Sequence, residues 1–265
     1  MSMKERLSYL FKNTAFSKMR NFIDKTTLFA FDLDGTLAPI ASKPSVIGIP
    51  DPIRQEFAIL NKQAVVAVIT GRSRSDALHH LGISPHYLIG NHGAEGLPGW
   101  KDQENEFFGI TNQWQSQLDN LLPLENRRGI MIENKGSTLS IHYRHVCNIK
   151  YAHKMILQAI DKLDPQPRRI GGKFIENLIP VSAPDKGIAF RILMEKSGCQ
   201  KGFFVGDDET DEDIFRLNDA NIFTVRIGIN VFSDALFYLR NQSEIIRLIS
   251  EINNVLKNKK DQLIN

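Results

Sequence analysis

The run AVVAVIT at residues 64–70 constrains the fold most strongly, because five of its seven residues are β-branched and none is charged. A strand that is apolar on both faces, instead of alternating, is typical of the buried interior of a parallel sheet. Parallel neighbours must be joined by long crossovers, which are usually helices. The run therefore predicts a layered α/β fold.

Other short apolar runs alternate with amphipathic patterns along the chain. The expected strands are 28–32, 64–70, 87–90, 202–206 and 221–227. The expected helices are 52–61, 73–81, 186–197 and 243–257, with a further short amphipathic helix or arm within 3–24. This βαβ order predicts a doubly wound parallel sheet.

The pattern changes between residues 102 and 182. We expect helices at 106–122 and 149–163, a hairpin of strands 129–134 and 138–143, and two short strands within 168–180. The predicted organisation is an N-terminal arm at 1–24, a core formed by 25–101 and 183–265, and an inserted α/β domain at 102–182.

Composition argues against several functional classes. The formal net charge of the 265 residues is +3, which gives no indication of nucleic-acid binding. The two cysteines, Cys147 and Cys199, form no metal-ligand pattern and no disulfide framework. Charges interrupt the apolar stretches of residues 1–16, so we expect no signal peptide, and no apolar run approaches the length of a membrane span. These features favour a cytoplasmic protein, with a monomer as the default state.

Polar residues follow the predicted strands at the ends where ligands bind in open α/β sheets. Asp32 and Asp34 follow the first strand, and Thr70, Gly71 and Arg72 come at the end of the second. Lys186 begins the first helix after the insertion, and Asp207 and Asp208 follow the strand 202–206. On a parallel sheet these positions are expected to converge.

The convergent set has the chemistry needed for phosphoryl transfer. Four carboxylates (Asp32, Asp34, Asp207 and Asp208) repel one another unless a cation neutralises them, and oxygen ligands together with a substrate phosphate favour Mg²⁺. Lys186 and Arg72 add positive charge, and Thr70 adds a hydroxyl donor. One carboxylate can act as nucleophile and the other, two residues on, can move the proton. Gly35 permits a tight turn near the phosphate.

These residues carry a family resemblance. The stretches DLDGT (32–36), the apolar strand ending in Thr70, the helix-initial Lys186 and GDDxxD (206–211) resemble the four signatures of the haloacid dehalogenase-like (HAD) hydrolases. The resemblance implies that Asp32 is the nucleophile and that Asp34 is the general acid/base, whose backbone carbonyl also contacts Mg²⁺. It further implies Asp207 and Asp208 as metal ligands, with Thr70 and Lys186 at the phosphate.

Four further stretches resemble the trehalose-6-phosphate phosphatases. They are NHGAE (91–95), ENKGSTLSIHYR (133–144), DKG (185–187) and GDDETDED (206–213). The resemblance implies a HAD-like Rossmannoid core with an α/β type 2 cap, and a disaccharide phosphate whose hydroxyls meet Glu133 and Lys135. The expected substrate-binding residues are Leu33, Gly35, Gly71, Arg72, His92, Glu133, Lys135, Arg144, Lys173 and Asn177.

One stretch departs from that family's pattern. Members usually carry a glutamate three residues before the proline of a GKxxxExxP-like segment. In GKFIENLIP (172–180) that position is Asn177, and Glu176 is displaced by one. A shift of one residue in a strand points the side chain to the opposite face. Either a local bulge restores Glu176 to the site, or the sugar site differs.

Alternatives stay open for several residues. If they have no functional role, Arg72 is a surface charge and Thr70 caps the following helix. His92 and His142 are then structural histidines, and Arg144 can pair with a carboxylate of the insertion. Asp211 to Asp213 suit a helix N-terminus through the macrodipole. The expected activity is that of a trehalose-phosphatase (EC 3.1.3.12). The alternatives are a phosphatase for glucosylglycerol phosphate or mannosyl-3-phosphoglycerate, or a non-catalytic module that binds a sugar phosphate.

Overall fold

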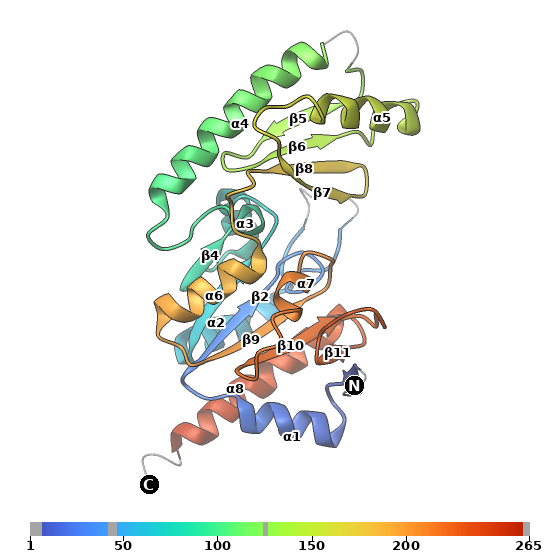
Figure 1. Cartoon of the computed structure of the whole chain (residues 1–265). Coiled ribbons are helices and arrows are strands. Elements are labelled where there is room, and N and C mark those ends of the chain that lie inside the picture. Colours follow the sequence, from blue (N-terminus) through green and yellow to red (C-terminus); the bar gives the residue numbers. More distant parts are fainter. Residues whose placement is uncertain (1–6, 42–46, 124–126, 262–265) are drawn as a thin grey trace, which may run out of the picture. The chain divides into compact units, whose positions relative to one another are not determined.

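The computed structural model describes residues 7–41, 47–123 and 127–261. The chain divides into two compact units, the first formed by Met1–Pro98 with Pro184–Asn265 and the second by Gly99–Ala183 (Figure 1). In the described part of the chain, no helix combines the length and the apolar character needed to cross a membrane.

A seven-stranded parallel sheet forms the centre of the first unit. Its order is β1 (Ser8–Tyr9), β11 (Phe237–Leu239), β10 (Ile222–Ile227), β9 (Lys201–Gly206), β2 (Thr27–Phe31), β3 (Val65–Ile69) and β4 (Tyr87–Ile89). The central strands are buried on both faces, as the continuous apolar runs predict. The structure thus confirms the expected parallel α/β fold.

Helices cover both faces of this sheet. They are α1 (Asn13–Phe22), α2 (Asp51–Gln63), α3 (Arg74–Leu81), α6 (Lys186–Ser197), α7 (Glu212–Phe215) and α8 (Ile245–Asp261), with the short 3-10 turns η2 (Asn91–Gly93) and η4 (Gln242–Glu244). Side chains of α1, α2 and α8 share one core with Phe29 and Phe203. On the opposite face, Phe190 of α6 lies edge-on against Phe204 of β9, with ring centroids 5.9 Å apart.

The N-terminal segment differs from the expected single helix. Ser8 and Tyr9 pair with the edge strand β11 before the chain enters α1. Leu10 and Met19 are fully buried in the core of the first unit. Residues 8–22 are therefore built into the sheet edge and one helical layer of that unit.

The second unit consists of a four-stranded antiparallel sheet and two helices. The sheet order is β5 (Met131–Asn134), β6 (Leu139–His142), β8 (Ile175–Ile179) and β7 (Arg168–Gly172). The helices are α4 (Lys101–Leu121) and α5 (Ile149–Ile160). Trp114 of α4 and Ile156 of α5 pack with Ile141 of β6 in one core, so both helices cover the same face. β5 and β6 form the expected hairpin.

Candidate active site

Strand register brings the first acidic residues together. β2 pairs with β9 in parallel register, with Phe31 opposite Val205. The backbone N–H of Asp32 continues this pairing by donating to the Val205 carbonyl at 2.9 Å. Asp32 and Asp207 therefore follow adjacent strands at the same edge of the sheet, as the sequence predicts.

Lys186 reaches this edge from the start of α6. The Asp185 side chain caps the helix by accepting from the Ile188 N–H at 2.8 Å. The Lys186 ammonium donates to Asp32 Oδ1 at 2.8 Å and to Asp211 Oδ1 at 2.7 Å. Lys186 is 1% exposed and Asp211 is fully buried, so this is a desolvated charge cluster. Burial opposes the charge of Lys186, but the carboxylates of Asp211 and Asp32 raise its pKa well above the ordinary value.

Asp211 shapes the acidic loop after β9. Its second oxygen, Oδ2, accepts from the backbone N–H groups of Asp207 at 2.7 Å and Asp208 at 3.0 Å. Gly206 lets this side chain close over the loop, because a Cβ there would lie 2.2 Å from Asp211 Cγ. Sequence reasoning assigned Asp211 to the helix N-terminus and did not select it as a site residue. The sequence feature that could have identified Asp211 is its spacing, since it is a carboxylate four residues after Asp207, which itself follows the glycine at the end of the strand.

Three carboxylates form a compact cluster. Oxygen atoms of Asp32, Asp207 and Asp211 lie within 4.8 Å of one another. Burial and the neighbouring carboxylates of Asp211 and Asp208 raise the pKa of Asp207 to about 7. Burial also raises the pKa of Asp32, although Lys186 opposes this. A single ammonium leaves the cluster with excess negative charge, so a divalent cation with oxygen ligands matches this donor set.

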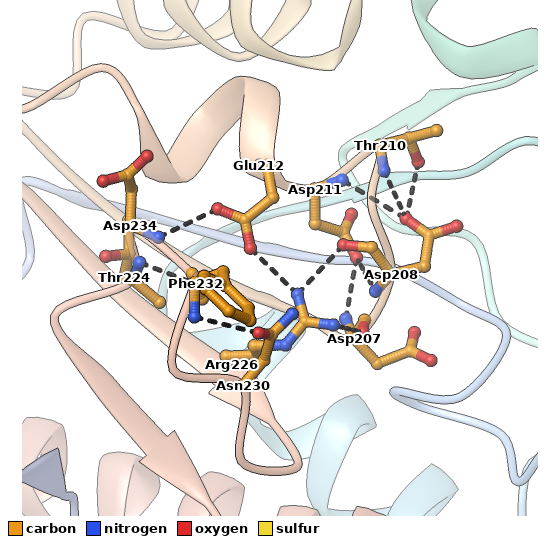
Figure 2. Close-up of polar contacts among 12 residues, drawn as sticks. Asp207, Asp208, Thr210, Asp211, Glu212, Thr224, Arg226, Asn230, Phe232 and Asp234 are labelled. Carbon is orange, nitrogen blue, oxygen red and sulfur yellow. Dashed lines mark hydrogen bonds and ion pairs between the residues drawn. The ribbon is translucent and has the colours of Figure 1, made fainter. Parts of the chain in front are cut away.

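Asp208 faces its own loop in the structure. Its Oδ1 accepts from the Thr210 N–H at 2.8 Å and the Thr210 hydroxyl at 2.7 Å (Figure 2). Although burial opposes it, Lys186 and these hydrogen bonds lower the pKa of Asp208. Asp208 lies beside the three-carboxylate cluster and organises the loop.

Arg72 holds the Asp34 carboxylate. The guanidinium donates from Nε and Nη2 to the two Asp34 oxygens, both at 2.7 Å, and from Nη1 to Asp76 at 2.7 Å. This bidentate fork is the strongest geometry available to such a pair. Asp32 and Asp34 are thereby separated, since Asp32 faces Lys186 while Asp34 faces Arg72.

The second strand end also meets the site loops. Thr70 is 1% exposed, and its hydroxyl accepts from the Arg72 N–H at 3.3 Å. A Cβ on Gly71 would lie 2.3 Å from the His92 ring, so only glycine permits that close approach. Leu33 is buried in the turn after β2, where its carbonyl accepts from the Ala38 N–H. The structure thus places Thr70 and Gly71 beside His92 at the end of β3, and Leu33 in the turn after the neighbouring strand β2.

Charged residues on the second unit form a smaller group. His142 Nε2 lies 2.8 Å from Glu133 Oε2, and the Lys135 ammonium lies 4.0 Å from the same oxygen. Arg144 and Lys173 are exposed. Glu133 and Lys135 are thus neighbours, as expected.

The register of β8 decides between Glu176 and Asn177. Asn177 pairs with Ser140, which pairs with Glu133 across the sheet, so these three side chains share one face. The regular pairing contains no bulge at Glu176. Glu176 lies on the helix-covered face, where its Oε1 is 2.8 Å from His153 Nε2 of α5. The bulge alternative is therefore wrong, and Asn177 occupies the Glu133 face.

The fold of this chain is that of a haloacid dehalogenase-like hydrolase, since it matches a solved hydrolase of this kind from Bacteroides thetaiotaomicron with TM-score 0.60, 13% identity and coverage of 85% and 99%. A model of the family described as trehalose-phosphatase matches residues 30–235. The chain belongs to this family, and it is a phosphoric monoester hydrolase by class.

Individual relatives are distant. The chain is 26% identical over 254 residues to probable trehalose-phosphate phosphatase G of Arabidopsis thaliana, covering 83% of this chain and 67% of the relative. It spans 56% of a probable rice trehalose-phosphate phosphatase. The fold matches a trehalose-6-phosphate phosphatase related protein, with TM-score 0.71, 21% identity and coverage of 86% and 97%. It also matches trehalose-6-phosphate phosphatase of Aspergillus fumigatus, with TM-score 0.64, 23% identity and coverage of 93% and 99%.

Proposed function

We propose that the protein is a Mg²⁺-dependent phosphatase that converts trehalose 6-phosphate and water into trehalose and phosphate, in trehalose biosynthesis in the cytoplasm. The observation that carries this proposal is the buried contact of Lys186 with Asp32 and Asp211 beside Asp207, in a chain of the trehalose-phosphatase family. Such a cluster suits a dianionic phosphoryl group bound together with a cation.

The residues that would hold Mg²⁺ are Asp32, Asp207 and Asp211, directly or through water. Their oxygens lie within 4.8 Å of one another, and carboxylates together with water are the ligands that this ion prefers. Bound Mg²⁺ neutralises charge on the phosphoryl oxygens. Asp208 and the backbone carbonyl of Asp34 complete the expected surroundings.

In the first step a carboxylate oxygen of Asp32 attacks phosphorus and the bond from phosphorus to the sugar oxygen breaks. Asp34, carrying the proton that it accepts from water in the preceding turnover, donates this proton to the departing oxygen, so trehalose leaves neutral and Asp32 carries the phosphoryl group. For this transfer, an oxygen of Asp34 must turn from the Arg72 fork toward the leaving group. Lys186 and Thr70 stabilise negative charge around the phosphoryl group.

In the second step water attacks the phosphorus of the aspartyl-phosphate. Asp34, now ionised, accepts a proton from that water, and the bond from phosphorus to the Asp32 oxygen breaks. Phosphate leaves, and Asp32 returns to its carboxylate form. The two neighbouring aspartates thus have different tasks, which the separate contacts of Asp32 with Lys186 and Asp34 with Arg72 support.

The sugar is proposed to contact the Glu133 face of the second unit. Glu133 and Lys135 can each hydrogen-bond to sugar hydroxyls, and Asn177 supplies an amide where a carboxylate is usual. The Asn177 amide already accepts from the Ser140 hydroxyl at 2.7 Å and donates to the Ile170 carbonyl at 3.3 Å. Loss of the negative charge at this position motivates the second candidate, a phosphatase for another glycosyl phosphate.

Phosphate release from a substrate panel tests the proposal. Trehalose 6-phosphate, glucosylglycerol phosphate, mannosyl-3-phosphoglycerate and glucose 6-phosphate are compared with Mg²⁺ and with EDTA. We expect kcat/KM to be highest for trehalose 6-phosphate, and activity to require Mg²⁺. Preference for another glycosyl phosphate would reject the substrate and favour the second candidate. Binding without any turnover would favour a regulatory module.

A further inference from the structure

Arg226 on β10 is a buried arginine next to the acidic loop. It is 8% exposed. Its Nη2 donates to the Asp207 carbonyl, and its Nη1 donates to the Asp208 carbonyl at 3.1 Å (Figure 2). One guanidinium therefore contacts two consecutive peptide groups of the loop that carries the Asp207 carboxylate.

Glu212 orients this guanidinium. Its Oε1 lies 3.0 Å from Arg226 Nη1, and both side chains are at most 10% exposed. The other oxygen, Oε2, accepts from the Asp234 N–H at 3.0 Å, which ties Glu212 to the chain after β10 (Figure 2). The planar fork of arginine suits several acceptors at once, whereas a lysine offers one nitrogen.

The Asp207 and Asp208 peptides are held from both sides. Their N–H groups donate to Asp211 Oδ2, while their carbonyls accept from Arg226. Asp211 also contacts Lys186, so the loop is braced between two buried cations. The Asp207 side chain has little freedom, because Gly35 packs so closely that a Cβ there would lie 2.1 Å from its Oδ2.

We propose that Arg226 is a positioning residue that fixes the Asp207–Asp208 backbone, and with it the Asp207 carboxylate, for cation binding in the acidic cluster. The hydrogen bonds of Arg226 go to these two carbonyls and to Glu212, so it holds the loop through its backbone, and its charge also favours the ionised Asp207 carboxylate, opposing the burial that raises the pKa of that group. The proposal rests on the proposed function for the identity of the cation. Partners behind metal ligands typically change metal affinity or activity about 10- to 100-fold when removed.

Calorimetric titration of the full chain with Mg²⁺, without substrate, measures this role separately from turnover. Arg226→Met removes the charge and every donor while keeping length. Arg226→Lys keeps the charge but cannot reach both carbonyls and Glu212. Arg216→Met is the matched control, because the Arg216 side chain is 62% exposed and forms a long ion pair with Asp234, at 3.6 Å. Thermal unfolding in EDTA reports whether each variant is folded.

We expect Arg226→Met to weaken Mg²⁺ binding about 10- to 100-fold and Arg226→Lys to give a smaller loss. Arg216→Met should bind within about twofold of the wild type. The kcat of Arg226→Met at saturating Mg²⁺ should recover toward the wild-type value, which a general structural defect would not produce. Unchanged affinity in folded Arg226→Met, or in Arg226→Lys if the former does not fold, would overturn the proposal.

The titration distinguishes this proposal from the proposed function. A wild-type chain that binds Mg²⁺ but releases no phosphate from trehalose 6-phosphate would reject the substrate while the Arg226 comparison still stands. A wild-type chain that hydrolyses trehalose 6-phosphate but binds Mg²⁺ equally well with Met at position 226 would reject the positioning role alone.

Discussion

Replacing Lys186 with methionine should destabilise the first unit more than any single surface-charge removal. Lys186 is 1% exposed and contacts the carboxylates of Asp32 and Asp211 at 2.8 and 2.7 Å. Methionine has a similar length but leaves both carboxylates without their ammonium. Removing one partner from a buried ion pair costs about 3–5 kcal/mol, because the remaining charge stays desolvated.

The expected loss of free energy of unfolding corresponds to a fall in Tm, which can be compared with the fall caused by the same substitution at Lys201. A loss of 1 kcal/mol lowers Tm by about 2–4 °C in chains near this size, so Lys186→Met should lower it by about 10 °C. Lys201 pairs with Asp24 at 2.6 Å, but the two side chains are 29% and 34% exposed. Such pairs contribute about 1 kcal/mol or less. Lys201→Met should therefore shift Tm by only a few degrees.

Thermal unfolding followed by circular dichroism in EDTA is the assay. Burial raises the pKa of both Asp32 and Asp211. Groups with raised pKa values stabilise the fold when protonated and lose that contribution as pH rises through the folded-state pKa. The Tm deficit of Lys186→Met should thus be large at pH 8 and smaller at pH 5. A deficit no greater than that of Lys201→Met at pH 8 would refute the buried-cluster account.

Three further predictions concern single residues. Gly35→Ala places a Cβ 2.1 Å from Asp207 Oδ2, at a backbone φ of +84°. In phosphate-release assays its kcat/KM should therefore fall more than about tenfold, which corresponds to about 1.4 kcal/mol. The control Gly198→Ala has φ +70° but open space around the new Cβ, so it should change stability alone. Burial raises the pKa of Asp24, but hydrogen bonds from Lys201 and Thr26 outweigh this and hold it at about 2. In denaturant titrations at pH 7, Asp24→Asn should therefore lower the free energy of unfolding by about 1 kcal/mol after screening. The difference in stability between this variant and the wild type should vanish as pH falls toward about 2. Asn177→Ala should raise KM with little change in kcat, whereas Glu176→Ala should lower Tm with little change in KM; the reverse pattern would contradict the observed register.

The sequence predicted the parts of the fold that have strong local patterns. The continuous apolar runs identified β2, β3, β9 and β10 because buried parallel strands need no alternation. It missed β1 and β11, short strands of two and three residues at one edge of the sheet. Helix α4 begins at Lys101 instead of 106, because its first turn is polar and shows no apolar periodicity.

The site residues that directly follow a strand, or that begin a helix near the strand ends, could be predicted from the sequence. Asp32, Asp207 and Lys186 were recognised from position and order. Asp211 was not, because its role depends on how the loop after β9 folds back on itself and on Gly206 leaving room. Arg226 lies within a buried strand and gave no signal, since only the register of β10 against β9 reveals that its guanidinium reaches the Asp207 and Asp208 carbonyls.

Phosphate release from trehalose 6-phosphate by Asp32→Asn tests the central claim most directly. Asparagine keeps the shape of the side chain but removes the nucleophilic carboxylate that Lys186 contacts. With saturating Mg²⁺, and with a folded variant verified by circular dichroism, we expect no measurable turnover where the wild type releases phosphate continuously. Turnover by Asp32→Asn at a rate near that of the wild type would contradict attack by Asp32 and the aspartyl-phosphate mechanism.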